Sequence, residues 1–163
     1  MAGAILARRL SFRRPNRPDR PDMAGWRHPG VMETATYQEN ARGAIDAARV
    51  QAAGEGKRVA VVFGSDWCPD CDAFKKALSH RLVSPIVDPS FVVVKVSVGN
   101  RDRNIDLMEQ YGMTVESGIP AVAIVEPDGS LVAAQLDGEF RNASCLLSVA
   151  EIVSFFHRYA PAH

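Results

Sequence analysis

Residues 58–82 have the sequence RVAVVFGSDWCPDCDAFKKALSHRL, and the rest of the chain can be interpreted outward from them. The almost uninterrupted apolar run over 58–64 predicts a buried β-strand. Residues 69–82 predict a helix, since a proline suits its first turn. Cys68 and Cys71 stand at the junction, separated by two residues, and can form a small disulfide without a large backbone movement. A Cys-x-x-Cys between a strand and a helix is typical of a thiol–disulfide redox centre.

Hydrophobic patterning and turn residues outline the remaining elements. Further helices are predicted over 34–54, 104–111 and 145–159, and further strands over 91–98, 119–126 and 131–136, with a tight turn at 127–130 and a loop around Pro85 and Pro89. The order α-β-α-β-α-β-β-α gives a parallel β-α-β unit, an antiparallel hairpin and a closing helix. We therefore predict one α/β domain over residues 33–163.

The composition fits a single globular domain and argues against several other classes of protein. The chain has 163 residues, of which 47% are hydrophobic, and this is enough for a core. Its formal net charge is zero, so no nucleic-acid partner is expected. Three cysteines are too few for a disulfide-rich scaffold, and no apolar run approaches the roughly 20 residues that span a bilayer. We expect no metal site, because no ligand spacing relates the four histidines, His28, His80, His157 and His163.

Residues 1–30 differ from the rest and are predicted to be a disordered arm rich in arginine and proline. The arm has seven arginines and two aspartates, a formal charge of +5. Three interpretations remain open: a start assigned too early, with Met23 or Met32 as the true start, a processed leader, or a functional basic tail. No convincing export signal is found, and an unpaired Cys145 suits a reducing compartment, so the cytoplasm is favoured and the periplasm is the alternative.

Two motifs, together with the element order, carry a resemblance to a known family. Trp67-Cys68-Pro69-Asp70-Cys71 follows the first core strand, and Gly118-Ile119-Pro120 precedes the hairpin. Over residues 33–160 the chain resembles the thioredoxin superfamily, most closely the bacterial thioredoxin-like disulfide reductases and isomerases. The resemblance implies a thioredoxin fold, with a mixed four-stranded sheet flanked by helices and an extra N-terminal helix. It also implies a cis Pro120 that faces the cysteines and leaves the Ile119 backbone free to pair with an extended substrate.

The two cysteines are predicted to have different roles. Cys68 is expected to be the nucleophile, because the free N–H groups and the positive end of the helix dipole stabilise a thiolate at the helix N-terminus. Cys71, one turn further along, is expected to be more buried and to resolve the mixed disulfide made by Cys68. The alternatives are a structural cysteine pair, or a module that binds Cu(I) or zinc through soft thiolates.

The residues around the cysteines are expected to tune the redox couple. Pro69 stiffens the turn, and Trp67 shields one side of the pair. Asp70, with Asp66 and Asp72 close in sequence, places negative charge near the thiolate and disfavours it, which predicts a more reducing couple. The alternative is that these aspartates are solvated and screened.

Two further residues have open interpretations. In thioredoxin, a lysine at the position of Lys95 works with a buried aspartate, and the matching residue here is Val62, so that aspartate is missing. Glu126 or water is a candidate substitute, and Lys95 alone can equally extend its ammonium from the end of the strand to solvent. Cys145 is expected to be a small buried apolar side chain, or else a regulatory or intermolecular thiol.

These observations predict an enzyme, a thiol–disulfide oxidoreductase acting on protein disulfides. The chain has no flavin or nicotinamide motif, so no added cofactor is expected and a separate reductase must supply the electrons. A monomer is expected. Reductase is favoured over isomerase because no second domain that would dimerise or hold unfolded substrate is visible. The alternatives are an isomerase or oxidant in an exported setting, the metal-binding module, and a redox-inert interaction domain.

Overall fold

The computed structural model describes residues 37–145 and 148–162, so the predicted arm over 1–30 lies outside the described residues. Its helices are α1 (Ala41–Glu55), α2 (Pro69–Leu78), α3 (Ser84–Ser90), α4 (Ile105–Gln110) and α5 (Val149–Tyr159), with a short 3-10 turn at Val115–Ser117. Its strands are β1 (Arg58–Gly64), β2 (Phe91–Ser97), β3 (Ala121–Val125) and β4 (Leu131–Ala134). Within 37–145 and 148–162, no helix combines the length and apolar character that a bilayer span requires.

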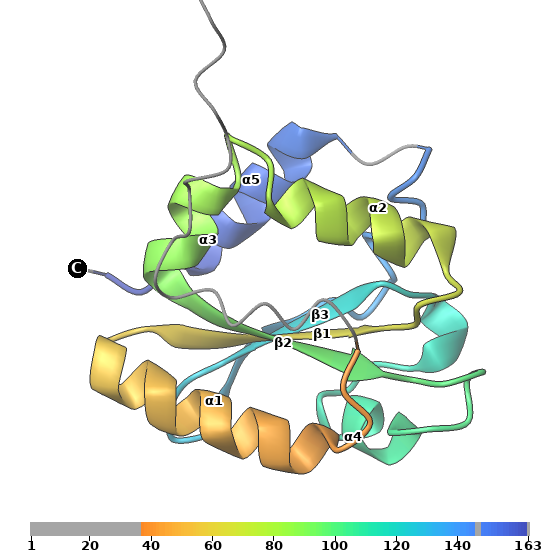
Figure 1. Cartoon of the computed structure of the whole chain (residues 1–163), viewed down its shortest axis with the longest axis horizontal. Coiled ribbons are helices and arrows are strands. Elements are labelled where there is room, and N and C mark those ends of the chain that lie inside the picture. Colours follow the sequence, from red (N-terminus) through yellow and green to blue (C-terminus); the bar gives the residue numbers. More distant parts are fainter. Residues whose placement is uncertain (1–36, 146–147, 163) are drawn as a thin grey trace, which may run out of the picture.

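The four strands form one mixed sheet in the order β2-β1-β3-β4. β1 runs parallel to β2 and antiparallel to β3, and β3 pairs with β4 as an antiparallel hairpin. Helices α1 and α4 cover one face of the sheet, and α2, α3 and α5 cover the other (Figure 1). The predicted thioredoxin-like fold, with its mixed sheet and its additional N-terminal helix, is therefore confirmed.

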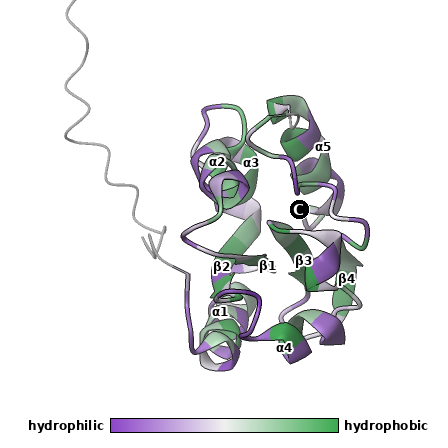
Figure 2. Cartoon of the chain, turned by 90° about the vertical axis from the view of Figure 1, so that its right-hand side faces the viewer, coloured by the Kyte–Doolittle hydropathy of each residue, from purple (hydrophilic) through white to green (hydrophobic). Residues whose placement is uncertain are grey.

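β1 lies between β2 and β3 and contributes to a core on each face of the sheet. Val61 and Phe63 belong to the core beneath α1, whereas Ala60 and Val62 belong to the core beneath α2, α3 and α5. This alternation follows from the two-residue period of a strand. Because both faces are covered, the strand is apolar from Val59 to Phe63, and Figure 2 shows it between two helical layers. The buried strand gives the turn that follows Gly64 a fixed starting point.

The segment around Pro85 and Pro89 was predicted to be a loop and is instead the helix α3. Pro85 lies in its first turn, where a backbone N–H has no intrahelical acceptor and its loss is tolerated. Val83 at the N-cap position and Val87 within the helix are both buried in the core on this face and hold the helix against the sheet. Tertiary packing thus outweighs the local preference of the prolines. The preceding helix α2 ends at Leu78, four residues before the predicted end.

The last helix begins at Val149, and the prediction that it begins near Cys145 was wrong. Ser148 is its N-cap: the Ser148 side chain accepts the N–H of Glu151, and the Glu151 carboxylate accepts the N–H of Ser148 at 2.8 Å. This reciprocal arrangement is a capping box, and its Ser-x-x-Glu pattern is present in the sequence. Residues 141–145 form turns instead of a first helical turn.

Removing this cap has an expected cost. The variant Ser148→Ala should lower the free energy of unfolding by about 1 kcal/mol, because the N–H of Glu151 loses its acceptor. Urea denaturation followed by circular dichroism measures the change. Ser154→Ala, on the exposed side of the same helix, is the matched control and should stay within about 0.5 kcal/mol of the unaltered protein. Equal effects of the two variants would contradict a capping role for Ser148.

The first helix begins at Ala41 and not at 34, because Asn40 caps it and residues 37–40 are not helical. The Asn40 side chain accepts the N–H of Gly43 at 3.4 Å. Gln38 lies alongside β2, where its N–H donates to the Lys95 carbonyl at 2.8 Å and its carbonyl accepts the N–H of Ser97 at 3.0 Å. This pairing brings residue 37 to the C-terminal ends of β1 and β2, at the edge of the sheet where the chain leaves β1 for the Cys-x-x-Cys segment.

Candidate active site

The turn between β1 and α2 is tied to the loop that follows β2. The Ser65 hydroxyl and the Trp67 indole N–H both donate to the Gly99 carbonyl, at 2.5 and 2.8 Å. The N–H of Cys68 donates to the Ser65 carbonyl at 3.2 Å. Trp67 is nevertheless 52% exposed. The turn therefore holds a flat apolar side chain at the surface, directly before the first cysteine.

Cys68 is the N-cap residue of α2, and Pro69 occupies the first position of that helix. The Cys68 sulfur accepts the backbone N–H of Cys71 at 3.3 Å. Cys68 is 5% exposed and Cys71 is fully buried, so the order of exposure is the predicted one. An N–H group at a helix N-terminus favours negative charge on the atom that accepts from it. This geometry suits a sulfur that must become a thiolate.

The interior position of Cys71 sets its protonation. Burial raises the pKa of the Cys71 thiol well above its usual range, and a hydrogen bond with the Cys68 side chain raises it further. The backbone of Ser65 and the hydroxyl of Tyr37 act in the opposite direction, because both form hydrogen bonds to the Cys71 sulfur. Cys71 is therefore a neutral thiol near neutral pH.

The loop before β3 faces the cysteines. The Ile119–Pro120 peptide bond is cis, as the resemblance implies, and both residues are buried. The Cys68 thiol donates to the Ile119 carbonyl oxygen, 3.8 Å from the sulfur. The cysteine that lies nearer the surface and the backbone next to the cis proline thus share one side of the molecule.

The Asp70 side chain forms hydrogen bonds with the loop that precedes α5. One oxygen of its carboxylate accepts both the N–H and the hydroxyl of Ser144, at 2.9 and 2.5 Å. The next residue, Cys145, is exposed, so the expectation of a small buried apolar side chain was wrong. Cys145 lies in turns that precede the helix and is not on its apolar face. The third cysteine is thus held near the start of α2 through Asp70.

The charge of Asp70 is expected to influence the redox couple. The variant Asp70→Asn keeps an oxygen that can accept from Ser144 but removes the charge. Its thiolate should be more stable, which should make the couple more oxidising by roughly 10–30 mV. Equilibration with glutathione buffers measures the potential. Asp72→Asn is the control, since the Asp72 carboxylate already pairs with Lys75 and Lys76. An unchanged or more reducing potential in Asp70→Asn would contradict the expectation.

The region of the missing aspartate is apolar. Val62 is buried and lies opposite Lys95 in the pairing of β1 with β2. Lys95 is half-buried, and burial lowers the pKa of its ammonium; Lys75 lowers it further and Asp66 opposes the shift. The suggestion that Glu126 substitutes for the aspartate was wrong. Glu126 follows the end of β3, beside the start of β1, and accepts from Arg58 at 2.8 Å, at the opposite end of the sheet from the cysteines.

Tyr37 is a residue of this site that the sequence did not single out. It is 5% exposed, belongs to the same core cluster as both cysteines, and its hydroxyl hydrogen-bonds the Cys71 thiol. Burial raises the pKa of the Tyr37 phenol far above its usual range, and the two cysteine sulfurs add to the effect. Residue 37 falls within the helix predicted over 34–54, and no motif in the sequence marks it as a site residue.

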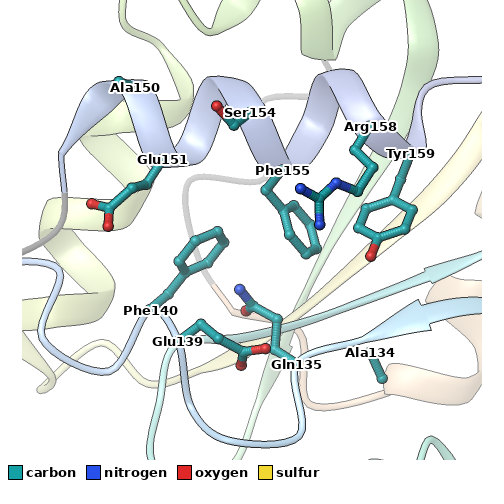
Figure 3. A pocket seen from close by; sticks show the side chains of 10 residues that line it. All are labelled: Ala134, Gln135, Glu139, Phe140, Ala150, Glu151, Ser154, Phe155, Arg158 and Tyr159. Carbon is teal, nitrogen blue, oxygen red and sulfur yellow. The ribbon is translucent and has the colours of Figure 1, made fainter.

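A concave region of about 410 Å³ lies between the end of β4 and α5. Figure 3 shows the Gln135 side chain pointing into it, toward Phe140 and Phe155. The side-chain oxygen of Gln135 accepts the N–H of Val122 at 3.0 Å, while its side-chain amide nitrogen has no partner among the described residues. The lining includes no residue of the Cys-x-x-Cys segment or of the cis-proline loop, so this region is separate from the dithiol. No group of three or more potential metal ligands occurs in the described ranges.

Comparisons with known proteins agree with this geometry. A family model described as Thioredoxin-like matches residues 40–127. A disulphide isomerase from Xylella fastidiosa Temecula1 is 35% identical, with a TM-score of 0.69 over 75% of this chain and 94% of its own. A thioredoxin from Thermus thermophilus is 25% identical, with a TM-score of 0.51 over 69% and 80% of the two chains.

A more distant structure shows the same fold. The C-terminal domain of Neisseria meningitidis DsbD, in its oxidised form, is 20% identical, with a TM-score of 0.56 over 76% of this chain and 98% of its own. No curated protein matches the sequence. The family model covers the Cys-x-x-Cys turn and the Xylella structure matches three quarters of the chain, and on that evidence the chain belongs to the thioredoxin-like family.

Proposed function

We propose that this protein is a thiol–disulfide oxidoreductase that reduces or exchanges protein disulfides through Cys68 and Cys71. The observation that carries the proposal is the position of the Cys68 sulfur. It caps α2, accepts the N–H of Cys71 at 3.3 Å, and lies 3.8 Å from the Ile119 carbonyl beside the cis proline. A nucleophilic sulfur, a second thiol within the same turn, and a backbone segment for substrate are thus adjacent.

The proposed reaction has two exchange steps. The Cys68 thiolate attacks one sulfur of a substrate disulfide, and the other substrate sulfur leaves as a thiolate and takes up a proton. Cys71 then loses its proton and attacks the Cys68 sulfur, which forms the Cys68–Cys71 disulfide and releases the second substrate sulfur as a thiol. The substrate gains two electrons and the dithiol loses two. A separate reductase must return the pair to the dithiol.

Substrate would bind where the exposed Trp67 ring and the Ile119 backbone flank the Cys68 sulfur. An extended segment of a protein substrate can pair with backbone groups at this position, and the indole face offers apolar contact. Such recognition depends on the backbone more than on particular side chains. Proteins with accessible disulfides are therefore the substrate class we propose.

Within this class we favour the reductase direction. Three aspartates, Asp66, Asp70 and Asp72, lie within seven residues, and Asp70 is only half-buried beside the cysteine turn. Negative charge near the sulfur disfavours the thiolate and therefore the reduced form, which makes the couple a better reductant. The second candidate is disulfide isomerisation, and the observation in its favour is that the 35% identical Xylella protein is called a disulphide isomerase.

The reduction potential separates the two candidates. Trp67 is close to the dithiol, so its fluorescence can report the redox state during equilibration with glutathione. A potential of roughly −220 mV or lower supports a reductase, and a value between roughly −120 and −180 mV supports an isomerase or oxidant. Reactivation of scrambled ribonuclease, compared with reduction of insulin, provides a second readout. A protein that forms no reversible Cys68–Cys71 disulfide would overturn the proposal.

A further inference from the structure

We infer that the Tyr37 hydroxyl is the group that assists Cys71 in the second exchange step, by donating a hydrogen bond to the Cys71 sulfur as it becomes a thiolate. The inference rests on the proposed function and names a further residue for that chemistry. Tyr37 would act on the resolving cysteine alone, and not on the first attack by Cys68.

The position of Tyr37 is fixed by backbone pairing. Its neighbour Gln38 is held at the edge of β2 by backbone hydrogen bonds to Lys95 and Ser97, and Asn40 then caps α1. The tyrosine side chain is directed into the core beneath α1, where it is 5% exposed and shares a cluster with both cysteines. Its hydroxyl is hydrogen-bonded to the Cys71 thiol.

A glycine makes room for this hydroxyl. A Cβ atom built on Gly64 would overlap the oxygen of Tyr37 and the ring carbon that bears it. Gly64 is the last residue of β1, and its backbone is not in the left-handed region, so its glycine is required by the close approach of the tyrosine. Two positions far apart in the sequence therefore combine to place one polar atom against Cys71.

The other side of the sheet does not offer an acidic group at the matching strand position. Val62 points into the core beneath α2, α3 and α5, whereas Tyr37 and Cys71 belong to the core beneath α1. The polar contact to the resolving thiol thus comes from the face opposite Val62. Buried sulfur needs such a contact, because a thiolate without a donor in an apolar interior is strongly disfavoured.

The chemical role of Tyr37 follows from where the proton of Cys71 goes. Before Cys71 can attack the Cys68 sulfur, its thiol must lose a proton, and the product side gains that proton on the released substrate thiolate. A phenol with its own proton firmly held cannot act as the base near neutral pH. It can donate to the developing thiolate, and the hydrogen bond from Tyr37 lowers the pKa of Cys71 against the effect of burial.

The test separates the two exchange steps in one reaction. All proteins in this test carry Cys145→Ser, because the exposed Cys145 thiol would otherwise react with the reagent as well. The reduced protein is mixed with excess dithiobis-nitrobenzoate in a stopped-flow instrument. The first coloured thiolate is released when Cys68 attacks the reagent, and the second when Cys71 attacks the mixed disulfide on Cys68. In Tyr37→Phe we expect an unchanged first phase and a second phase slowed about tenfold, with its pH profile moved to higher pH.

Two further variants make the result specific. Tyr111→Phe removes a hydroxyl from a second tyrosine, which is half-buried against the same core with its ring 6.1 Å from that of Phe63, and should change neither phase. Gly64→Ala displaces the Tyr37 hydroxyl and should slow the second phase when Tyr37 is in place, but not further in Tyr37→Phe.

An unchanged second phase in Tyr37→Phe would overturn the inference. So would an equal slowing of both phases, because that result indicates a general loss of packing. The proposed function fails differently: the Cys145→Ser protein with Tyr37 in place would then release no second thiolate from the reagent.

Discussion

Cys68→Ser is expected to abolish disulfide reductase activity, with a loss of at least about a thousandfold in the rate of insulin reduction. The hydroxyl of serine is a far weaker nucleophile than a thiolate, and the helix N-terminus cannot ionise it near neutral pH. Because Cys68 caps α2 through its side chain and serine is also a good N-cap, the fold should persist. Circular dichroism of the variant should therefore match that of the unaltered protein.

Cys71→Ser should give a different outcome. Cys68 can still attack a substrate disulfide, but no thiol remains to release the product, so a covalent mixed disulfide should accumulate. Non-reducing electrophoresis with a disulfide-containing substrate detects it, and added dithiothreitol removes it. Cys145→Ser is the control and should keep activity within about twofold, because Cys145 is exposed and no hydrogen bond links it to either active cysteine in the described residues.

These three variants also test the alternatives. If Cys68→Ser retained activity, Cys68 would not be the nucleophile. If Cys145→Ser lost activity, Cys145 would have a part in the reaction. If Cys71→Ser formed no mixed disulfide although Cys68 reacts with alkylating reagents, the pair would not be acting as a redox dithiol.

Gly138→Ala should be the most destabilising small substitution in the loop between β4 and α5. Gly138 has a φ of +64°, in the left-handed region, and a Cβ atom there would overlap the carbonyl oxygen of Ser117. The obstacle is backbone and cannot rotate away as a side chain would. We expect a loss of about 3 kcal/mol in the free energy of unfolding, measured by urea denaturation.

The same substitution should also reduce activity. Ser117 and Gly118 lead directly into the Ile119–Pro120 bond, so a displaced Ser117 carbonyl moves the segment opposite Cys68. Gly54→Ala is the matched control, since nothing lies within 4 Å of a Cβ at that position in α1. It should raise stability by about 0.5–1 kcal/mol, because alanine favours a helix. Similar stability changes in the two variants would contradict the overlap at Gly138.

The main elements of the fold could be predicted because local and tertiary signals agree over most of the chain. The apolar run of β1, the turn at 127–130 and the apolar stripe of α5 each indicate one structure. Prediction failed where packing or capping outweighs composition. Two prolines suggested a loop at α3, yet Val83 and Val87 bury it as a helix. The start of α5 differs from the prediction because the Ser148–Glu151 capping box sets it, and not the apolar pattern.

The dithiol of the site could be predicted because its chemistry is local. Cys68 and Cys71 lie in one turn, so sequence spacing alone places them together. Groups that reach the cysteines through tertiary structure could not be found in this way. Tyr37 reaches the site because Gln38 pairs with β2. Glu126 is a plausible substitute for the missing aspartate from sequence alone, but the antiparallel register places it at the other end of the sheet. Neither position can be predicted from the local amino-acid composition.

The hydrogen bonds between Ser144 and Asp70 allow the reactivity of Cys145 to be used as a probe of how this loop contacts α2. The chain has three cysteines, so oxidation of the active pair leaves Cys145 as the single thiol that an alkylating reagent can modify. Any replacement at position 70 that loses the acceptor for Ser144 would release residues 141–145 from α2 as well as alter charge. The alkylation rate of Cys145 in the oxidised protein would then report how firmly this loop is docked, independently of the redox potential.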